Sequence, residues 1–451
     1  MLDLDFTLTR QTTVPLYKQL AEHIKKEIRQ QHLKSADKLP SIRKLAAVLN
    51  LSRTTVENTY NLLLTDGYII SQPQKGYLVV NLQETETPLI VPSFAPKIPE
   101  PPLYDFANNY IDIHTFNTAL WRRCTNNTLK TPANIASYGE AQGESKLREA
   151  LATYSYESRG VLAAPEQIVI GAGLQSLLAI LLNTLPITNK KAAFEPPGFA
   201  KAELIFASAG WQVEQFTMQD LETQTLPPLL FISPTNPYKG TMLTANERIE
   251  LLNWAKHTNG FIIEDDYNGE FRYFARPTGA LQGLEGGDNV IYFGSFSRLL
   301  MPSLRISYMV LPSKLLPYYR EKSLLFNQTS STIEQLTLAE FIAAGHLGRH
   351  VRRLRKLYAQ KNILLRQYLQ EIFGERIEVT AYTSGLHIKL RIKTATSGKL
   401  LYQKALTIGV RIISLPQTPQ MVFPEILLSF AGIKEEELKP ALLLLRKAWF
   451  D

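Results

Sequence analysis

Residues 38–69, which read KLPSIRKLAAVLNLSRTTVENTYNLLLTDGYI, decide the fold of the N-terminal part of the chain. Pro40 interrupts any regular structure before it, and the serine that follows can cap a helix over residues 41–49. A second helix fits residues 52–65, because Ser52 is a suitable cap and an apolar stripe follows at helical spacing. Two short helices separated by a two-residue turn have the spacing of a helix-turn-helix.

The flanking residues complete a small domain. Apolar residues recur at every fourth position from Leu16 to Ile28, which predicts an amphipathic helix before the pair. After the pair, the apolar runs at 68–70 and 77–80 are separated by a turn and predict a β-hairpin. Its place in the chain is that of the wing in a winged helix.

The positions that a winged helix presents to DNA carry suitable side chains. The first residues of the second helix reach base edges, while basic residues of the first helix and the wing meet phosphates. We therefore expect DNA contacts from Arg43, Lys44, Ser52, Arg53, Thr54, Thr55, Lys75 and Gly76. Residues 1–80 hold eleven lysines and arginines against seven acidic residues, an excess of four. For each residue alone, a solvated surface charge is the alternative explanation.

The composition excludes several other classes of protein. The chain has 451 residues, no apolar stretch close to the roughly 18 residues of a membrane span, and no signal-peptide pattern at its start. Its one cysteine, Cys124, allows no internal disulfide and no cysteine-based zinc site. We therefore expect a cytoplasmic protein without a metal ion and without a membrane partner.

A proline-rich segment divides the chain. Residues 81–103 hold six prolines and no glycine, and no helical or strand period runs through them, as in a semi-extended linker. We expect a winged-helix DNA-binding domain over residues 1–80 and an α/β domain over 104–451. The α/β domain would have a large part over about 104–325 and a smaller C-terminal α+β part over about 326–451.

Five apolar runs in the second domain each end abruptly in glycine or polar residues. They read QIVIGAGLQS, KAAFEPPGF, PLLFISPTNP, GFIIEDDYN and NVIYFGSFSR. Such runs are typical of buried parallel strands, whose carboxyl ends form the ligand-binding edge of an open α/β sheet. Helical stretches such as residues 245–257 fit the crossovers between them.

These motifs resemble two known families. PLYKQLAEHIKKEI, the stretch quoted first and KGYLVV resemble the GntR-type winged-helix domain, with departures in the turns at 30–38 and 71–77. YGEAQGESKLREALATY, SPTNPYKGTM and IIEDDYNGEFRY resemble the type I fold of enzymes that depend on pyridoxal phosphate, the aminotransferase-like class, over residues 104–451. A GntR-type head joined to such a domain is the architecture of the MocR family of transcriptional regulators.

The resemblance implies a binding site for pyridoxal phosphate. An aspartate would pair with the ring nitrogen, an asparagine and a tyrosine would approach the phenolic oxygen, and a phenylalanine would stack on the ring. These residues are Asp265, Asn236, Tyr267 and Phe199. The phosphate would be held by Gly173, Leu174, Ser295, Ser297 and Arg305. A strand-end carboxylate and a structural ion pair are the ordinary alternatives for the aspartate and the arginine.

Two positions depart from the catalytic pattern of the related enzymes. By the resemblance, the lysine that forms the Schiff base is replaced by Arg298 in GSFSRLLMPSLR. A guanidinium group stays protonated and has no free amine, so Arg298 cannot form that link. The arginine that holds a substrate carboxylate is replaced by Leu427, and Lys201 is a candidate substitute cation or an ordinary solvated lysine. Transamination is therefore not expected, and no residue is assigned as catalytic.

The expected function is that of a DNA-binding transcriptional regulator whose aminotransferase-like domain senses an effector and supports dimerisation. The cofactor would be pyridoxal phosphate, pyridoxamine phosphate or an amino-acid adduct, held without a covalent bond. In a competing hypothesis, Arg298 folds onto Asp265 and excludes any cofactor. The family implies a domain-swapped head-to-tail homodimer on double-stranded operator DNA. An aminotransferase-like enzyme with a DNA-binding head, and a regulator that senses an unrelated small anion, are the alternatives.

Overall fold

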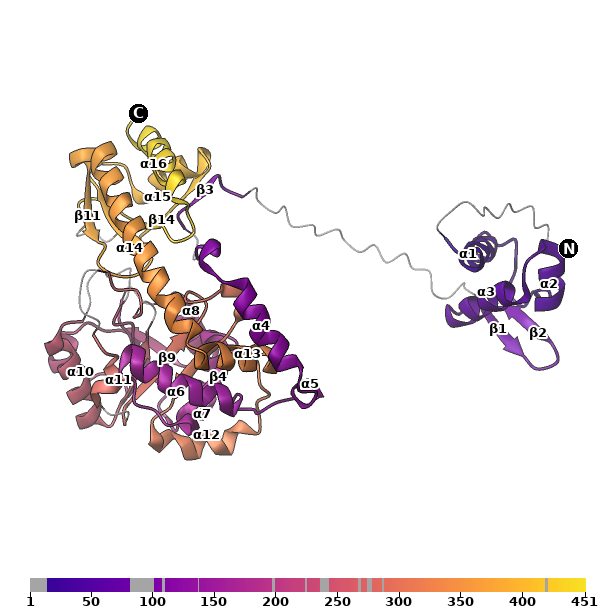
Figure 1. Cartoon of the computed structure of the whole chain (residues 1–451), viewed down its shortest axis with the longest axis horizontal. Coiled ribbons are helices and arrows are strands. Elements are labelled where there is room, and N and C mark those ends of the chain that lie inside the picture. The colour runs from indigo at the N-terminus through magenta and orange to yellow at the C-terminus, as the bar shows by residue number, and fades with distance from the viewer. Residues whose placement is uncertain are drawn as a thin grey trace. The chain divides into compact units, whose positions relative to one another are not determined.

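The chain divides into two compact units, Met1–Pro99 and Glu100–Asp451, which are described separately (Figure 1). The computed structural model describes residues 14–81, 101–107, 110–136, 138–196, 199–223, 225–235, 243–266, 269–273, 278–285, 288–417 and 421–451. Within these ranges, no helix is long and apolar enough to cross a bilayer.

The first unit contains three helices and a hairpin around one apolar core (Figure 1). Its elements are α1 (Leu16–Arg29), α2 (Ile42–Leu49), α3 (Arg53–Thr65), β1 (Ile69–Gln72) and β2 (Gly76–Val79), with β1 and β2 antiparallel. Ser41 and Ser52 cap α2 and α3, because their hydroxyl groups accept from backbone amides three residues on. Asn50 ends α2 in the left-handed conformation and makes the short turn.

One basic residue of α1 is structural. Lys25 lies between the apolar positions of this helix, yet its side chain is buried in the structure. Its Nζ lies 2.7 Å from a carboxylate oxygen of Glu22 and 2.8 Å from one of Asp66, which follows α3. This charge therefore joins α1 to the end of α3.

A seven-stranded mixed sheet forms the centre of the second unit. The strands are β4 (Ile168–Gly171), β5 (Lys191–Phe194), β6 (Gln212–Gln215), β7 (Leu229–Ile232), β8 (Phe261–Asp265), β9 (Val290–Ser295) and β10 (Ser307–Val310), in the order β4-β10-β9-β8-β7-β5-β6. The five predicted strands are present and run in one direction. Between two of them lies β10, which is antiparallel to both neighbours because the chain turns back across the sheet directly after β9.

Helices cover the sheet, so that its strands other than the edge strand β6 are buried on both faces (Figure 1). Phe231, Ile263 and Phe293 face one core, whereas Leu230 and Ile262 face another. This double burial explains the continuous apolar runs in the strands. The helices are α4 (Thr118–Leu129), α5 (Ala133–Ala136), α6 (Ser145–Arg159), α7 (Leu174–Thr184), α8 (Ala200–Ser208), α9 (Asp220–Thr223), α10 (Ala245–Thr258), α11 (Leu281–Glu285), α12 (Leu316–Ser323), α13 (Thr332–Ala343) and α14 (His346–Phe373). Short 3-10 turns occur at Ile113–Thr115, Pro165–Gln167, Pro302–Leu304, Ser313–Leu315 and Gly374–Arg376.

An antiparallel subdomain forms the C-terminal part. Its sheet has the order β11-β12-β15-β14, and α14 packs against α16 beside it. The elements are β11 (Ile377–Ala381), β12 (His387–Ile392), α15 (Gly398–Thr407), β13 (Val410–Arg411), β14 (Ile413–Ser414), β15 (Glu425–Ser429) and α16 (Glu435–Phe450). The predicted fold class, a winged helix joined to a type I aminotransferase-like domain with a smaller α+β part, is confirmed.

The segment at the start of the second unit is anchored to this subdomain. Its strand β3 (Tyr104–Asp105) pairs in parallel with β13, and Asp105 forms an ion pair with Arg411. The Ser429 amide donates to the Phe106 carbonyl at 2.8 Å. Further along, the buried Lys361 ammonium lies 2.8 Å from a carboxylate oxygen of Asp112. The residues that follow the proline-rich segment are therefore fixed to the C-terminal sheet.

Candidate functional site

The strand ends bring the predicted pocket residues of the second unit together. Gly173 follows β4, Asp265 ends β8, Ser295 ends β9 and Arg305 lies just before β10. Since β4, β8 and β9 run in the same direction and β10 runs against them, these positions share one edge of the sheet. This is the edge at which open α/β sheets bind ligands.

The start of α7 and the Arg305 guanidinium lie against each other. Arg305 Nη2 donates to the Ala172 carbonyl at 3.2 Å, and Gly173 has a φ of +98°. A Cβ at Gly173 would lie 2.5 Å from Arg305 Nη2, so a side chain at this position would displace the guanidinium. The Gly173 amide, predicted to contact the phosphate, donates instead to the Gly171 carbonyl, and α7 begins at Leu174. A helix N-terminus beside an arginine fork is suited to an anion such as phosphate.

Three serine hydroxyl groups lie along the same edge. Ser307 Oγ donates to Ser295 Oγ at 3.0 Å, and Ser295 Oγ donates to Ser297 Oγ at 3.4 Å. Ser307 is buried and opens β10, so its position depends on the antiparallel pairing that the sequence did not indicate. Hydroxyl groups that can rotate suit the several oxygens of a phosphate.

Two adjacent aspartates at the end of β8 have different environments. Asp266 is buried: its carboxylate accepts from Arg159 Nε at 2.6 Å and from the Tyr292 hydroxyl at 2.8 Å. The Asp265 carboxylate has no hydrogen-bonding partner within the described part of the chain, whereas its carbonyl accepts from Ser233 Oγ at 2.9 Å. Asp266 is therefore structural, and Asp265 is available to a ligand.

Burial raises the pKa of Asp265 to about 7, with Asp266 acting in the same direction and Arg298 against it. An ionised carboxylate at this position is costly without a cationic partner. The protonated ring nitrogen of a pyridine ligand would supply one.

We expect Asp265→Asn to stabilise the second unit and Asp266→Asn to destabilise it. The pKa of Asp265 is higher in the folded protein than its ordinary value of 3.8, so its ionisation favours the unfolded chain as pH rises from about 4 to 7. At pH 8 the Asp265→Asn variant should therefore gain about 1–3 kcal/mol, and less at pH 5. Urea unfolding of both variants at the two pH values measures this, and a loss of stability in Asp265→Asn would contradict the assignment.

Arg298 lies in the turn after β9 and is partly buried. Its charge opposes the upward shift of the Asp265 pKa, yet the described residues show no ion pair between the two side chains within 4.0 Å. Leu427 is fully buried in β15, so no cation stands at that position.

The structure describes two of the four further predicted positions. Phe199 caps α8 and packs against the same core as Leu174, while Lys201 is exposed. Asn236 and Tyr267 lie outside the described residues.

Sequence reasoning missed His387 and Arg159. His387 begins β12, is only 4% exposed, and has a buried Nδ1 without a hydrogen-bonding partner in the described part of the chain. The available signal was a polar residue among the apolar ones of the run GLHIKL. Arg159 ends α6 and had no local signal, because its partner Asp266 is more than a hundred residues away.

The residues predicted to contact DNA lie on α2, α3 and the hairpin turn. Arg43, Lys44, Arg53, Thr54 and Lys75 are exposed. Ser52 and Thr55 also make contacts inside the unit. Ser52 Oγ caps α3 and lies 2.7 Å from the Thr55 hydroxyl oxygen. Gly76 has a φ of +95° and opens β2 directly after Lys75, which the turn presents.

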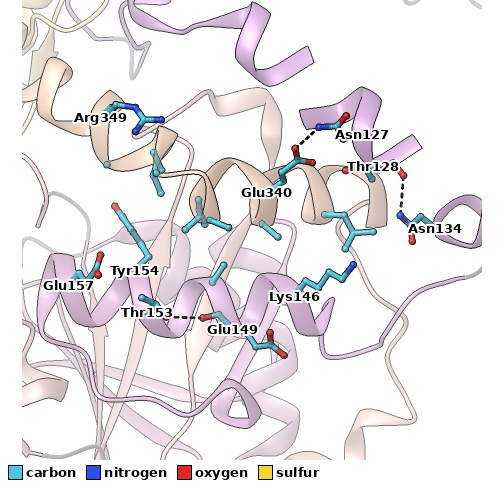
Figure 2. A pocket seen from close by; sticks show the side chains of 18 of the residues that line it. Asn127, Thr128, Asn134, Lys146, Glu149, Thr153, Tyr154, Glu157, Glu340 and Arg349 are labelled. Atoms are coloured by element: carbon cyan, nitrogen blue, oxygen red, sulfur yellow. Dashed lines mark hydrogen bonds between the residues drawn. The ribbon is translucent and has the colours of Figure 1, made fainter. Parts of the chain in front are cut away.

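A separate cavity of about 920 Å³ lies among α4, α6, α13 and α14 (Figure 2). Asn127 donates to a Glu340 carboxylate oxygen at 2.7 Å on its wall. Lys146, Glu149, Glu157 and Arg349 also line it. These charges are of both signs, and none of the pocket residues predicted from the sequence lies there.

Known proteins match both units. The family model for bacterial regulatory proteins of the gntR family matches residues 16–79, and the model for aminotransferase class I and II matches residues 108–443. Among solved structures, a kynurenine aminotransferase of Pyrococcus horikoshii has a TM-score of 0.67 at 20% identity, over 76% of this chain and 90% of that one. The molecule is thus a DNA-binding helix-turn-helix protein with an aminotransferase-like domain.

Full-length relatives define the family further. The HTH-type transcriptional regulator YdeL of Bacillus subtilis is 37% identical over 99% of this chain and all of that protein. The probable rhizopine catabolism regulatory protein MocR of Rhizobium meliloti is 29% identical over 98% of this chain and 95% of its own. The pyridoxine biosynthesis regulator PdxR of Corynebacterium glutamicum is 27% identical over 86% of each. The chain belongs to the MocR-type family of GntR transcriptional regulators.

Proposed function

We propose that this regulator binds a vitamin B6 phosphate without a covalent bond and does not transform it. The observation that carries the proposal is the shared edge of the strand ends, where Arg298 lies in the turn after β9. Leu174 at the start of α7, Arg305 and the serines suit the phosphate, and the unpartnered Asp265 carboxylate suits a protonated ring nitrogen. When bound, the vitamer would supply an electron-accepting ring, but Arg298 offers no amine to link it.

The geometry favours an open ring site over an excluded one. If Arg298 filled the site by pairing with Asp265, the two groups would lie in contact and the pKa of the carboxyl would fall. In the described structure, no such contact is present within 4.0 Å and the pKa of Asp265 is raised to about 7. The non-covalent ligand would be pyridoxal phosphate, pyridoxamine phosphate or an adduct with an amino acid.

The C-terminal sheet offers a route from the pocket to the linker. His387 pairs with Ser429 across β12 and β15, and the Ser429 amide holds the Phe106 carbonyl. Phe106 follows the proline-rich segment that leads to the DNA-binding unit. A ligand that binds better to one position of this sheet would favour the matching position of Phe106. Through the proline-rich segment, it would thereby favour one arrangement of the DNA-binding units.

We further propose a cytoplasmic, domain-swapped head-to-tail homodimer on an operator of double-stranded DNA. Support comes from large apolar side chains left exposed on the second unit, among them Ile113, Tyr138, Leu324 and Leu325. Two heads in one assembly would bind paired half-sites more tightly than one head alone.

The direct test is a mobility-shift titration on the promoter upstream of the protein's own gene. The proposal expects a sharp, salt-dependent shift that a B6 phosphate changes, together with no turnover of amino donors. Turnover would favour the alternative of an aminotransferase-like enzyme with a DNA-binding head. A response to phosphate alone, and to no vitamer, would favour a sensor of an unrelated anion.

We expect Arg53→Ala to weaken operator binding about 5- to 150-fold, because a base contact from the start of α3 is worth about 1–3 kcal/mol. Lys75→Ala should weaken binding to all sequences and lower the salt slope by about one, as expected for a phosphate contact. Lys18→Ala removes an exposed charge of α1 and serves as the control. Equal effects of Arg53→Ala on operator and random DNA would argue against base recognition.

A further inference from the structure

The C-terminal sheet turns a polar face away from its apolar core. Along β12, Ile388, Leu390 and Ile392 belong to the core, whereas His387 and Lys389 alternate with them. Lys389 is neutralised by Glu425, with 2.6 Å between Nζ and a carboxylate oxygen. His387 has no such partner for its buried Nδ1 within the described residues.

The start of β12 is fixed beside the strand ends of the large sheet. The Gly385 amide donates to the Phe271 carbonyl at 2.8 Å, and the Tyr273 hydroxyl donates to the Gly385 carbonyl at 2.8 Å. Phe271 follows closely after Asp265 along the chain. The start of β12, where His387 lies, is thus held beside the segment that follows β8.

Arg298 and His387 act on each other electrostatically. Burial and, next, the positive charge of Arg298 lower the pKa of His387 to about 3, so the imidazole is neutral at physiological pH. A neutral imidazole offers one N–H donor and one acceptor, and a guanidinium offers only donors. Together they provide donors to an oxygen atom and repel a second cation.

Asp265 offsets only part of the positive charge at this edge. Its carboxyl group is partly protonated near pH 7, whereas Arg298 and Arg305 remain charged. By resemblance, the lysine that Arg298 replaces reaches the 4′ carbon of the vitamer. The substituent on that carbon would therefore face a guanidinium and a neutral imidazole.

We propose that Arg298 and His387 form a recognition site for an uncharged, oxygen-bearing 4′ substituent, so that the pocket selects against an aminomethyl group. The inference rests on the proposed binding of a B6 phosphate and specifies which form is bound. Pyridoxal phosphate and pyridoxine phosphate carry an oxygen at this position, whereas pyridoxamine phosphate carries an ammonium. The like charges of the ammonium and Arg298 would oppose each other at short range.

Calorimetric titration of the full chain with pyridoxine phosphate and pyridoxamine phosphate tests the proposal. The two ligands have nearly the same shape, and neither can react with a lysine. We expect pyridoxine phosphate to bind at least tenfold more tightly at pH 7. Equal affinities, or tighter binding of pyridoxamine phosphate, would overturn this inference and leave the proposed function intact. Binding of neither would overturn both.

Single substitutions show which residue discriminates pyridoxine phosphate from pyridoxamine phosphate. Arg298→Gln should reduce the affinity ratio severalfold or more by removing the repulsion, and His387→Leu should weaken pyridoxine phosphate about tenfold. Arg320→Gln removes an exposed arginine of α12 and should leave both affinities unchanged. Far-ultraviolet circular dichroism verifies that each variant folds. An unchanged ratio in folded Arg298→Gln, or an unchanged affinity in folded His387→Leu, would exclude that residue from the site.

Discussion

Replacing Arg298 by lysine is expected to give a protein that carries close to one covalent vitamer per chain, whereas the unmutated chain is expected to carry none. By the resemblance, the substitution supplies a primary amine at the position of the lysine that forms the Schiff base in catalytic members of the fold. The edge around Arg305 and Gly173, where we propose that the phosphate binds, would be unchanged, so the ligand would already be positioned. No other single substitution in the pocket should change the chemistry so completely.

The measurement is the absorption spectrum with pyridoxal phosphate, followed by borohydride reduction and mass analysis of peptides. Arg320→Lys adds a lysine at an exposed site of the same unit and controls for unspecific modification. If folded Arg298→Lys acquires no more label at residue 298 than the control acquires at residue 320, the strand-end pocket does not hold the vitamer.

Arg159→Leu should cost about 3–5 kcal/mol of the stability of the second unit, because it leaves the buried Asp266 carboxylate without its cation. Arg159 and Asp266 are 2% and 1% exposed at their side chains, with 2.6 Å between Nε and Oδ2. Arg159 also donates to the Thr278 carbonyl at 2.9 Å, so the truncation breaks further contacts. The end of β8, and with it Asp265, should lose its fixed position.

Urea unfolding of the second-unit transition measures this effect. The exposed pair of Lys439 and Glu371 has a similar distance of 2.7 Å, yet Lys439→Leu should change stability by less than about 1 kcal/mol. A similar loss in the two variants would show that burial does not decide the strength of the Arg159 pair.

Local patterns were sufficient to predict most of the fold. The caps Ser41 and Ser52 and the turn at Asn50 are signals within a few residues, and the structure bears them out. The apolar runs predicted five strands because a sheet buried on both faces needs apolar side chains at every position. Two strands were missed. The edge strand β6 is mostly exposed and has no apolar run, and the direction of β10 depends on which neighbours it meets and not on its own residues.

Sequence reasoning reached only part of the candidate site. Motif positions identified Asp265 and Arg305, and the shared strand edge brings them together. They gave no reason to expect that Asp266 would be neutralised by Arg159, because that contact joins α6 to β8. His387 was missed for a similar reason, because contacts between the C-terminal sheet and the segment after β8 set its position. Long-range pairing, which no local pattern encodes, decides these roles.

The central claim is that this aminotransferase fold recognises a B6 phosphate without transforming it. The most direct test incubates the unmutated full-length chain with pyridoxal phosphate and a mixture of L-amino acids, and then separates the vitamers by chromatography. The account predicts that pyridoxamine phosphate forms no faster than without protein. Its formation at a rate proportional to the protein concentration would contradict the account.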